Sequence, residues 1–387
     1  MAKSIYLDNS MTTHPSERAV SAMLPFFTDK WGNPSAPHSK GQEVVPAMEE
    51  SLKSIYRLLN AKEEDDFVFT SSGAEAVNHV INSVFNDVTH ASGKNQFITS
   101  NIDEAPALMA IGRLEKMGAV GKMINADKEG KITADSLAEA ITPRTALVSL
   151  SWANGLTGVI NPIKEIADMC KERGIFFHLD ATHILGKLFY EMDDVGAHFI
   201  TFNGDHLHAP KGTGGLWIKA KTKSTSFIVG GIEQGGHRAG SMNVPGLVAL
   251  GQAAREALDN RDFVCTEIAR LRDKLEKGVI EGFPEALLFF HDQERLPHCT
   301  TIGFPGIANE AMLYALNRKG VFANIGGGSF QQIGLILEAS GITKTLAHTA
   351  VNFSLSRETH EDEIDKAIDI IVDTAKRLSK ISVRLRE

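Results

Sequence analysis

The 387-residue chain has few cysteines and no long apolar run. Its three cysteines, Cys170, Cys265 and Cys299, lie far apart and form no CxxC or Cys/His spacing. They therefore predict neither a disulfide framework nor a structural zinc site. No stretch approaches the roughly 18 apolar residues that a membrane span needs, and the first residues lack the pattern of a signal peptide. We therefore expect a cytoplasmic protein with no membrane partner.

The chain also lacks an excess of positive charge. Its 40 Lys and Arg residues are outnumbered by 48 Asp and Glu residues, which gives a net charge of −8. Because sequence-independent nucleic-acid binding needs a basic face, we expect no nucleic-acid partner. Hydrophobic residues make up 43% of the chain, which is enough for a large core. At roughly 100–200 residues per domain, the length predicts two or three domains, or one large domain with a smaller companion.

Between about residues 66 and 220, short apolar runs alternate with helical patterns. Strands are predicted at 67–70, 96–99, 146–150, 175–179 and 198–202, and helices at 75–85, 105–116 and 163–173. The run 215–219 is expected to return antiparallel. Such alternation is typical of a mostly parallel sheet with helices on both faces.

The C-terminal third has a different pattern. Long helices are expected over 244–279, short strands at 287–290, 300–304 and 351–355, and a last helix with one apolar face over 361–378. We therefore predict an α/β fold with two domains. The large α/β domain covers residues 15–250 and has a mixed, mostly parallel sheet between helices. The smaller α+β domain combines residues 1–14 and 251–387.

Polar or small residues follow three of the predicted strands, where an open parallel sheet binds its ligands. After the first strand, Ser72, Gly73 and Ala74 leave N–H groups at a helix start that suit a phosphate, although such a turn is more often only a turn. After another strand, Asp180 could pair with a protonated ring nitrogen. The third segment, residues 203–214, is rich in ligand-type side chains.

Ordered motifs along nearly the whole chain resemble the class V aminotransferase-fold proteins, and above all the cysteine desulfurases of the NifS/IscS type, which use pyridoxal phosphate (PLP). The matching segments are YLDNSMTT (6–13), GNPS (32–35), FTSSGAE (69–75), HLDAT (178–182), PKG (210–212), RAGS (238–241) and FSLSR (353–357). The resemblance implies the type I fold of PLP-dependent transferases, a homodimer and PLP as cofactor. The cofactor-binding residues that it implies are Ser72, Gly73, Ala74, Asn154, Asp180, His183, Asn203, Asp205 and Ser241.

The residues that such desulfurases use for catalysis are replaced in this chain. His206 stands at the position of the Schiff-base lysine, Glu104 at that of the ring-stacking histidine, and Asn352 at that of the arginine that binds the substrate carboxylate. The loop 323–329, whose counterpart carries the sulfur-accepting cysteine, contains none. An imidazole cannot form the internal Schiff base, and the carboxylate of Asp205 would repel a phosphate dianion.

The chain matches the family at the motifs that form the fold and differs from it at the residues that carry out catalysis. This pattern favours a homologue that keeps the fold without desulfurase activity. We expect an interaction or regulatory role linked to iron–sulfur or sulfur metabolism, with another protein of sulfur transfer as a candidate partner. One alternative is a PLP- or pyridoxamine-phosphate-dependent enzyme that uses His206 as a base. The other is a metal- or small-molecule-binding protein. Histidine and aspartate suit zinc or iron, but their spacing here matches no known site, so no metal ligand is predicted.

Overall fold

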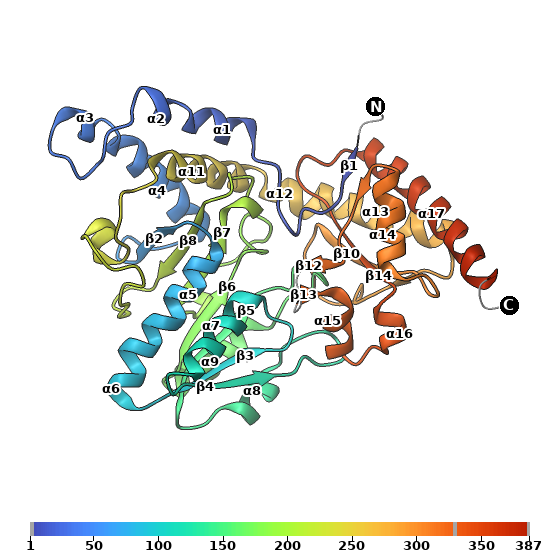
Figure 1. Cartoon of the computed structure of the whole chain (residues 1–387), viewed down its shortest axis with the longest axis horizontal. Helices are drawn as coiled ribbons and strands as arrows, with labels where there is room; N and C mark the ends of the chain where they lie inside the picture. Colours follow the sequence, from blue (N-terminus) through green and yellow to red (C-terminus); the bar gives the residue numbers. More distant parts are fainter. Residues whose placement is uncertain (1–3, 328–330, 385–387) are drawn as a thin grey trace.

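The computed structural model describes residues 4–327 and 331–384 and has the predicted α/β fold (Figure 1). Its central sheet has seven strands in the order β2 (Asp66–Thr70), β8 (Gly214–Ile218), β7 (Phe199–Asn203), β6 (Phe176–Asp180), β5 (Thr145–Ser151), β3 (Gln96–Ser100) and β4 (Val120–Ile124). Strand β8 pairs antiparallel with both β2 and β7, as predicted, and the other pairs are parallel. The sheet is therefore mixed and mostly parallel.

Helices cover both faces of this sheet. On one face, α5 (Gly73–Val84) and α7 (Ala105–Glu115) bury their apolar stripes against strand residues such as Phe97 and Phe199. The opposite face is covered by α4 (Val45–Leu59), α8 (Ala134–Ala140), α9 (Ile163–Glu172) and α11 (Val244–Asp259), which share a second apolar cluster. A strand that is buried on both faces consists of a continuous run of apolar residues, which explains why these strands could be predicted from the sequence.

The shorter elements of the first 260 residues connect these strands and helices. They are β1 (Ile5–Tyr6), α1 (Glu17–Met23), α2 (Pro25–Thr28), α3 (Ser39–Gln42), the π-helical turn Phe85–Thr89, α6 (His90–Ser92), α10 (Met192–Val195), and the 3₁₀ turns Gly204–His206 and Glu233–Gly236. Among the helices of residues 4–327 and 331–384, none combines the length and the apolar composition that a membrane span requires.

The C-terminal part forms its own sheet and core. Its elements are α12 (Arg261–Phe263), the π-helical turn Val264–Ile268, α13 (Ala269–Gly282), β9 (Leu287–Leu288), β10 (Cys299–Gly303), α14 (Asn309–Arg318), β11 (Val321–Phe322), β12 (Gly326–Gly327), β13 (Gln331–Gln332), α15 (Ile333–Ala339), α16 (Lys344–Ala347), β14 (Ala350–Ser354) and α17 (Glu361–Arg384). Strands β14, β10 and β9 form an antiparallel sheet, as expected. Ile5 and Leu7 belong to the same apolar cluster as α13, α14 and α17. The domain boundaries given above stay a prediction.

The N-terminal segment links the two parts of the molecule. β1 pairs with β11, and the amide Nδ2 of Asn9 donates to the carbonyl of Ser354 at 2.8 Å. Four residues later, the backbone N–H of Thr13 donates to the carbonyl of Asp205 at 2.8 Å, directly after β7. Residues 9–13 therefore run along the carboxyl edge of the large sheet. Because β2, β7, β6, β5 and β3 all point the same way, their ends meet at this edge.

Candidate functional site

A cavity of about 200 Å³ lies at the carboxyl edge of the large sheet. Five polar residues that the sequence predicted for the site line it together: Glu104 after β3, Asn154 after β5, His183 after β6, and Asn203 and His206 at the end of β7. Backbone from the C-terminal part, including the two glycines of β12, closes one side. The shared edge of parallel strands thus brings together residues that are up to 102 positions apart (206 − 104).

His206 lies in the 3₁₀ turn after β7 and is buried. Its Nε2 is 2.9 Å from the carbonyl oxygen of Ser10 and, because a carbonyl only accepts, this nitrogen carries the hydrogen. Its Nδ1 is 3.3 Å from Oδ1 of Asp205. Both ring nitrogens therefore face partners within the protein.

Asp205 is held as a carboxylate beside that ring. Its other oxygen accepts a hydrogen bond from the Thr12 hydroxyl at 2.9 Å, and the same hydroxyl accepts one from Lys211 at 2.9 Å. Burial alone would raise the pKa of Asp205, but the hydrogen bond and charge of His206, with Thr12 and Lys211, lower it below its usual value. An ionised carboxylate therefore stands beside the imidazole of His206.

Glu104 and His183 form a pair across the cavity. Oε1 of Glu104 is 2.9 Å from Nε2 of His183, and the His183 ring stands perpendicular to that of His206 at 5.1 Å between centroids. Burial lowers the pKa of His183, so the ring is neutral at pH 7 and donates its Nε2–H to the carboxylate. Burial, and then the charge of Glu104, raise the pKa of Asp180. A carboxylate, Glu104, thus stands where the resemblance implies the ring-stacking histidine.

The start of α5 is already capped by the protein. The Ser72 hydroxyl accepts from the N–H of Glu75 at 3.2 Å, and the N–H of Gly73 donates to Oδ1 of Asn203 at 3.2 Å. A Cβ on Gly73 would lie 3.3 Å from the Cβ of Asn203, so the small residue allows this close approach. The Asn203 amide therefore occupies the helix end where a phosphate was expected.

Other predicted residues lie beside the cavity rather than on it. Asp180 faces a smaller cavity of about 10 Å³ that Glu104 also lines. Asp205 contacts the ring of His206, and Gly73 contacts Asn203, which lines the cavity. Ser72 and Ala74 are not among the described residues that line it. Ser241 is exposed, and within the described chain it does not line the cavity.

Asp103 is a residue of the site that the sequence reasoning missed. It is buried, and its carboxylate accepts from the N–H groups of Ser100 at 2.8 Å and Ser151 at 2.6 Å and from the hydroxyl of Thr99 at 2.9 Å. These bonds fasten the loop that carries Glu104 to the end of β5. The aspartate three residues after Ser100, directly after a strand, was the available signal.

The residues of the cavity do not fit a covalently held PLP. Among its lining residues in the described chain none is a lysine. The N–H of Gly73 is already bonded to Asn203, and the carboxylate of Asp205 would repel a phosphate. Asn352 is buried in β14 with its amide bonded to the carbonyl of Leu156. Within residues 4–327 and 331–384, no group of three or more His, Cys, Asp and Glu side chains is placed to hold a metal ion.

Comparisons with known proteins agree with the resemblance in the motifs. The family model "Aminotransferase class-V" matches residues 5–367. "Cysteine desulfurase 2" of Trichormus variabilis is 37% identical over 382 residues, which cover 98% of this chain and 94% of that protein. "Cysteine desulfurase NifS" of Azotobacter vinelandii is 35% identical over 383 residues, with 98% and 94% covered. A solved structure of a NifS-like protein matches with a TM-score of 0.90 at 25% identity, covering 97% of this chain and all of that one. This chain therefore belongs to the class V aminotransferase family, as a relative of its PLP-dependent cysteine desulfurases.

Proposed function

We propose that this protein is a cysteine desulfurase-like homologue without desulfurase activity, which uses the fold for an interaction or regulatory role in sulfur or iron–sulfur metabolism. The observation that carries the proposal is His206. In place of a free amine, its imidazole is held between the carbonyl of Ser10 and the carboxylate of Asp205. A Schiff base needs a primary amine, so this position cannot supply one.

The cysteines support the same proposal. Cys170 and Cys299 are buried, and Cys265 is half-buried with its thiol 3.1 Å from the carbonyl of Lys187. Burial raises the pKa of all three thiols, so thiolate, the reactive form, is scarce at pH 7. The loop 323–329 contains no cysteine, and its residues 328–329 lie outside the described residues. The protein therefore has no reactive cysteine to accept sulfur.

We expect the purified protein to release neither sulfide nor alanine from cysteine, with or without added PLP. Its absorbance spectrum should lack the yellow band of a lysine-bound cofactor. The desulfurase of Azotobacter vinelandii, assayed in parallel, is the positive control. Turnover at a rate typical of that enzyme would overturn the proposal, and Lys211 would then be the first amine to replace.

A base at His206 and a metal site, two of the alternatives given above, gain no support from the site. A base at His206 would need a ring nitrogen directed at a ligand, but both nitrogens already face protein oxygens. A metal site would need a cluster of ligands, and the described residues contain none. We therefore propose no second function.

We also propose that the protein is a homodimer. Val229 and Ile232, in the segment between β8 and α11, are 80% and 90% exposed. The large apolar side chains of Leu24, Phe27 and Trp31 are exposed as well. Large apolar side chains that are exposed in a monomer often lie at protein–protein interfaces, and the RAGS segment that follows Val229 and Ile232 resembles one that reaches the partner's site in the family. The interface should therefore include residues 229–241.

Replacing Val229 and Ile232 together by aspartate should convert the dimer to a monomer. A two-fold interface contains each side chain twice, and burial of one Val or Ile contributes about 1.5–3 kcal/mol, so the loss is large. Light scattering after size exclusion measures the mass. Met117→Asp, at an exposed methionine elsewhere, should leave the dimer intact. A monomeric parent protein would contradict the proposal.

A further inference from the structure

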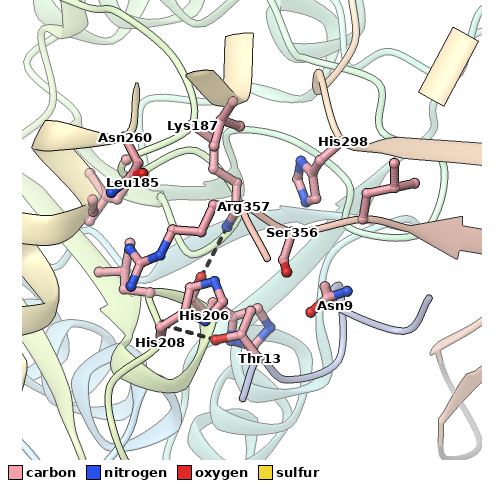
Figure 2. Close-up of a pocket in the computed structure, with 15 residues that line it drawn as sticks. Asn9, Thr13, Leu185, Lys187, His206, His208, Asn260, His298, Ser356 and Arg357 are labelled. Carbon is pink, nitrogen blue, oxygen red and sulfur yellow. Dashed lines mark hydrogen bonds between the residues drawn. The ribbon is translucent and has the colours of Figure 1, made fainter. Parts of the chain in front are cut away.

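A second cavity, of about 30 Å³, lies behind His206 (Figure 2). Apart from His206, its lining residues differ from those of the site described above. Lys187, His298, Ser356 and Arg357 line it together with His206. A single water needs roughly 10–15 Å³ of such space, so the cavity has room for about two waters or one small ion. It cannot hold a nucleotide, a sugar or PLP.

Lys187 brings a positive charge to this cavity. The residue is buried, with 9% of its surface exposed, and its Nζ donates to the carbonyl of His206 at 3.3 Å. No carboxylate of the described residues lies within 4.0 Å of this Nζ. A buried ammonium group without a counter-charge costs several kcal/mol, which an anion in the cavity would offset.

His298 supplies an independent observation. It is 2% exposed, and neither of its ring nitrogens has a hydrogen-bond partner among the described residues. Figure 2 shows the ring turned toward the cavity, between Lys187 and Ser356. Burial, followed by the charge of Lys187, holds the pKa of His298 well below its usual range, so the ring is neutral and has one N–H to donate. Buried polar donors rarely lack a partner, and the unpaired N–H of His298 indicates a bound hydrogen-bond acceptor.

The other charged group at the cavity is already compensated. The guanidinium of Arg357 contacts Oε2 of Glu256 at 2.5 Å, and both side chains are buried. The lining therefore keeps the positive charge of Lys187, which no ion pair among the described residues neutralises, and the unpaired N–H of His298. A species that matches both is small, has a single negative charge and accepts hydrogen bonds.

We propose that this cavity binds one monovalent anion of halide size, held by the ammonium of Lys187 and a ring N–H of His298. The anion accepts a hydrogen bond from the N–H of His298 and neutralises Lys187. Because Lys187 also holds the carbonyl of His206, the bound anion stabilises the turn that carries the imidazole.

Bromide and chloride test this site in the full-length protein. In crystals soaked in bromide, an anomalous peak should lie between Lys187 and His298, and ³⁵Cl NMR line broadening should report chloride binding in solution. Lys187→Met should abolish the peak and weaken chloride binding at least about tenfold, as expected for the loss of a charge-assisted hydrogen bond. His298→Leu should weaken it less. Lys171→Met, at an exposed lysine of α9, is the matched control and should change neither readout.

Three results would overturn the proposal. One is a cavity that contains only water after the bromide soak. Another is binding at crystal concentration only, with no line broadening at millimolar chloride. The third is chloride binding that is as strong in Lys187→Met and in His298→Leu as in the parent protein. Circular dichroism identifies a variant that fails to fold, and the other variant then decides the outcome.

Discussion

A triple variant with His206→Lys, Asp205→His and Asn203→Ser should bind PLP and turn yellow, whereas His206→Lys alone should bind it at most weakly. The lysine restores the primary amine that a covalent cofactor requires. In the single variant, the carboxylate of Asp205 still repels the phosphate, and the Asn203 amide still occupies the N–H of Gly73. A like charge at close range in a poorly solvated cleft costs a few kcal/mol, so Asp205→His should raise the affinity about 10- to 100-fold.

Equilibrium dialysis and the visible spectrum measure this series. His206→Arg in the Asp205→His background is the matched control, because arginine adds the charge without a primary amine, and it should stay colourless. The triple variant should still release no sulfide, since Glu104 and Asn352 remain and residues that act in one pathway are not additive. If His206→Lys alone binds PLP as strongly as the triple variant, then Asp205 and Asn203 do not oppose the phosphate.

The strands of the large sheet could be predicted because their burial leaves a trace in the sequence. Apolar runs such as the one around Phe177 mark strands that are covered on both faces. Strand β4 was missed for the opposite reason: it lies at the edge of the sheet, and Val120, Lys122 and Met123 are exposed. The expected strand 287–290 ends at Leu288, since Phe290 adopts a left-handed backbone with φ of 53°.

The location of the site could also be predicted, but its hydrogen bonds could not. The motifs assigned Glu104, His183 and His206 to strand ends, and strand ends share an edge. The contacts that decide the chemistry join residues far apart in the chain, as Gly73 with Asn203 and Ser10 with His206. They depend on the direction of each side chain after folding, which no local spacing encodes. Lys187 stayed unnoticed because nothing in the sequence distinguishes a buried lysine from an exposed one.

Loss of the ion pair of Glu276 and Arg295 should lower the stability of the protein strongly. Glu276 lies on α13, and Arg295 lies in the segment before β10. Oε2 of Glu276 accepts from Nη2 of Arg295 at 3.0 Å, and their side chains are 9% and 8% exposed. The backbone beside Arg295 bonds to the loop after β5, where Leu296 N–H donates to the carbonyl of Gly158 at 2.8 Å. The pair therefore fixes the segment that joins the small core to the loop carrying Asn154.

Glu276→Ala should lower the free energy of unfolding by about 3–5 kcal/mol, because it leaves the guanidinium of Arg295 buried without a counter-charge. Burial alone would raise the pKa of Glu276, but its hydrogen bond to Arg295 lowers it overall. A lowered folded-state pKa stabilises the protein above the carboxyl pKa of the unfolded chain, and this contribution is lost as the pH falls through the folded-state value. The difference in free energy of unfolding between parent and variant, measured by urea unfolding, should therefore be complete at pH 7 and become smaller in acid.

Lys277→Ala is the control. It replaces an exposed neighbour whose amine is 3.8 Å from Glu281, and it should change the free energy of unfolding by less than about 1 kcal/mol. A loss below about 1 kcal/mol in Glu276→Ala would mean that Arg295 finds another partner or water.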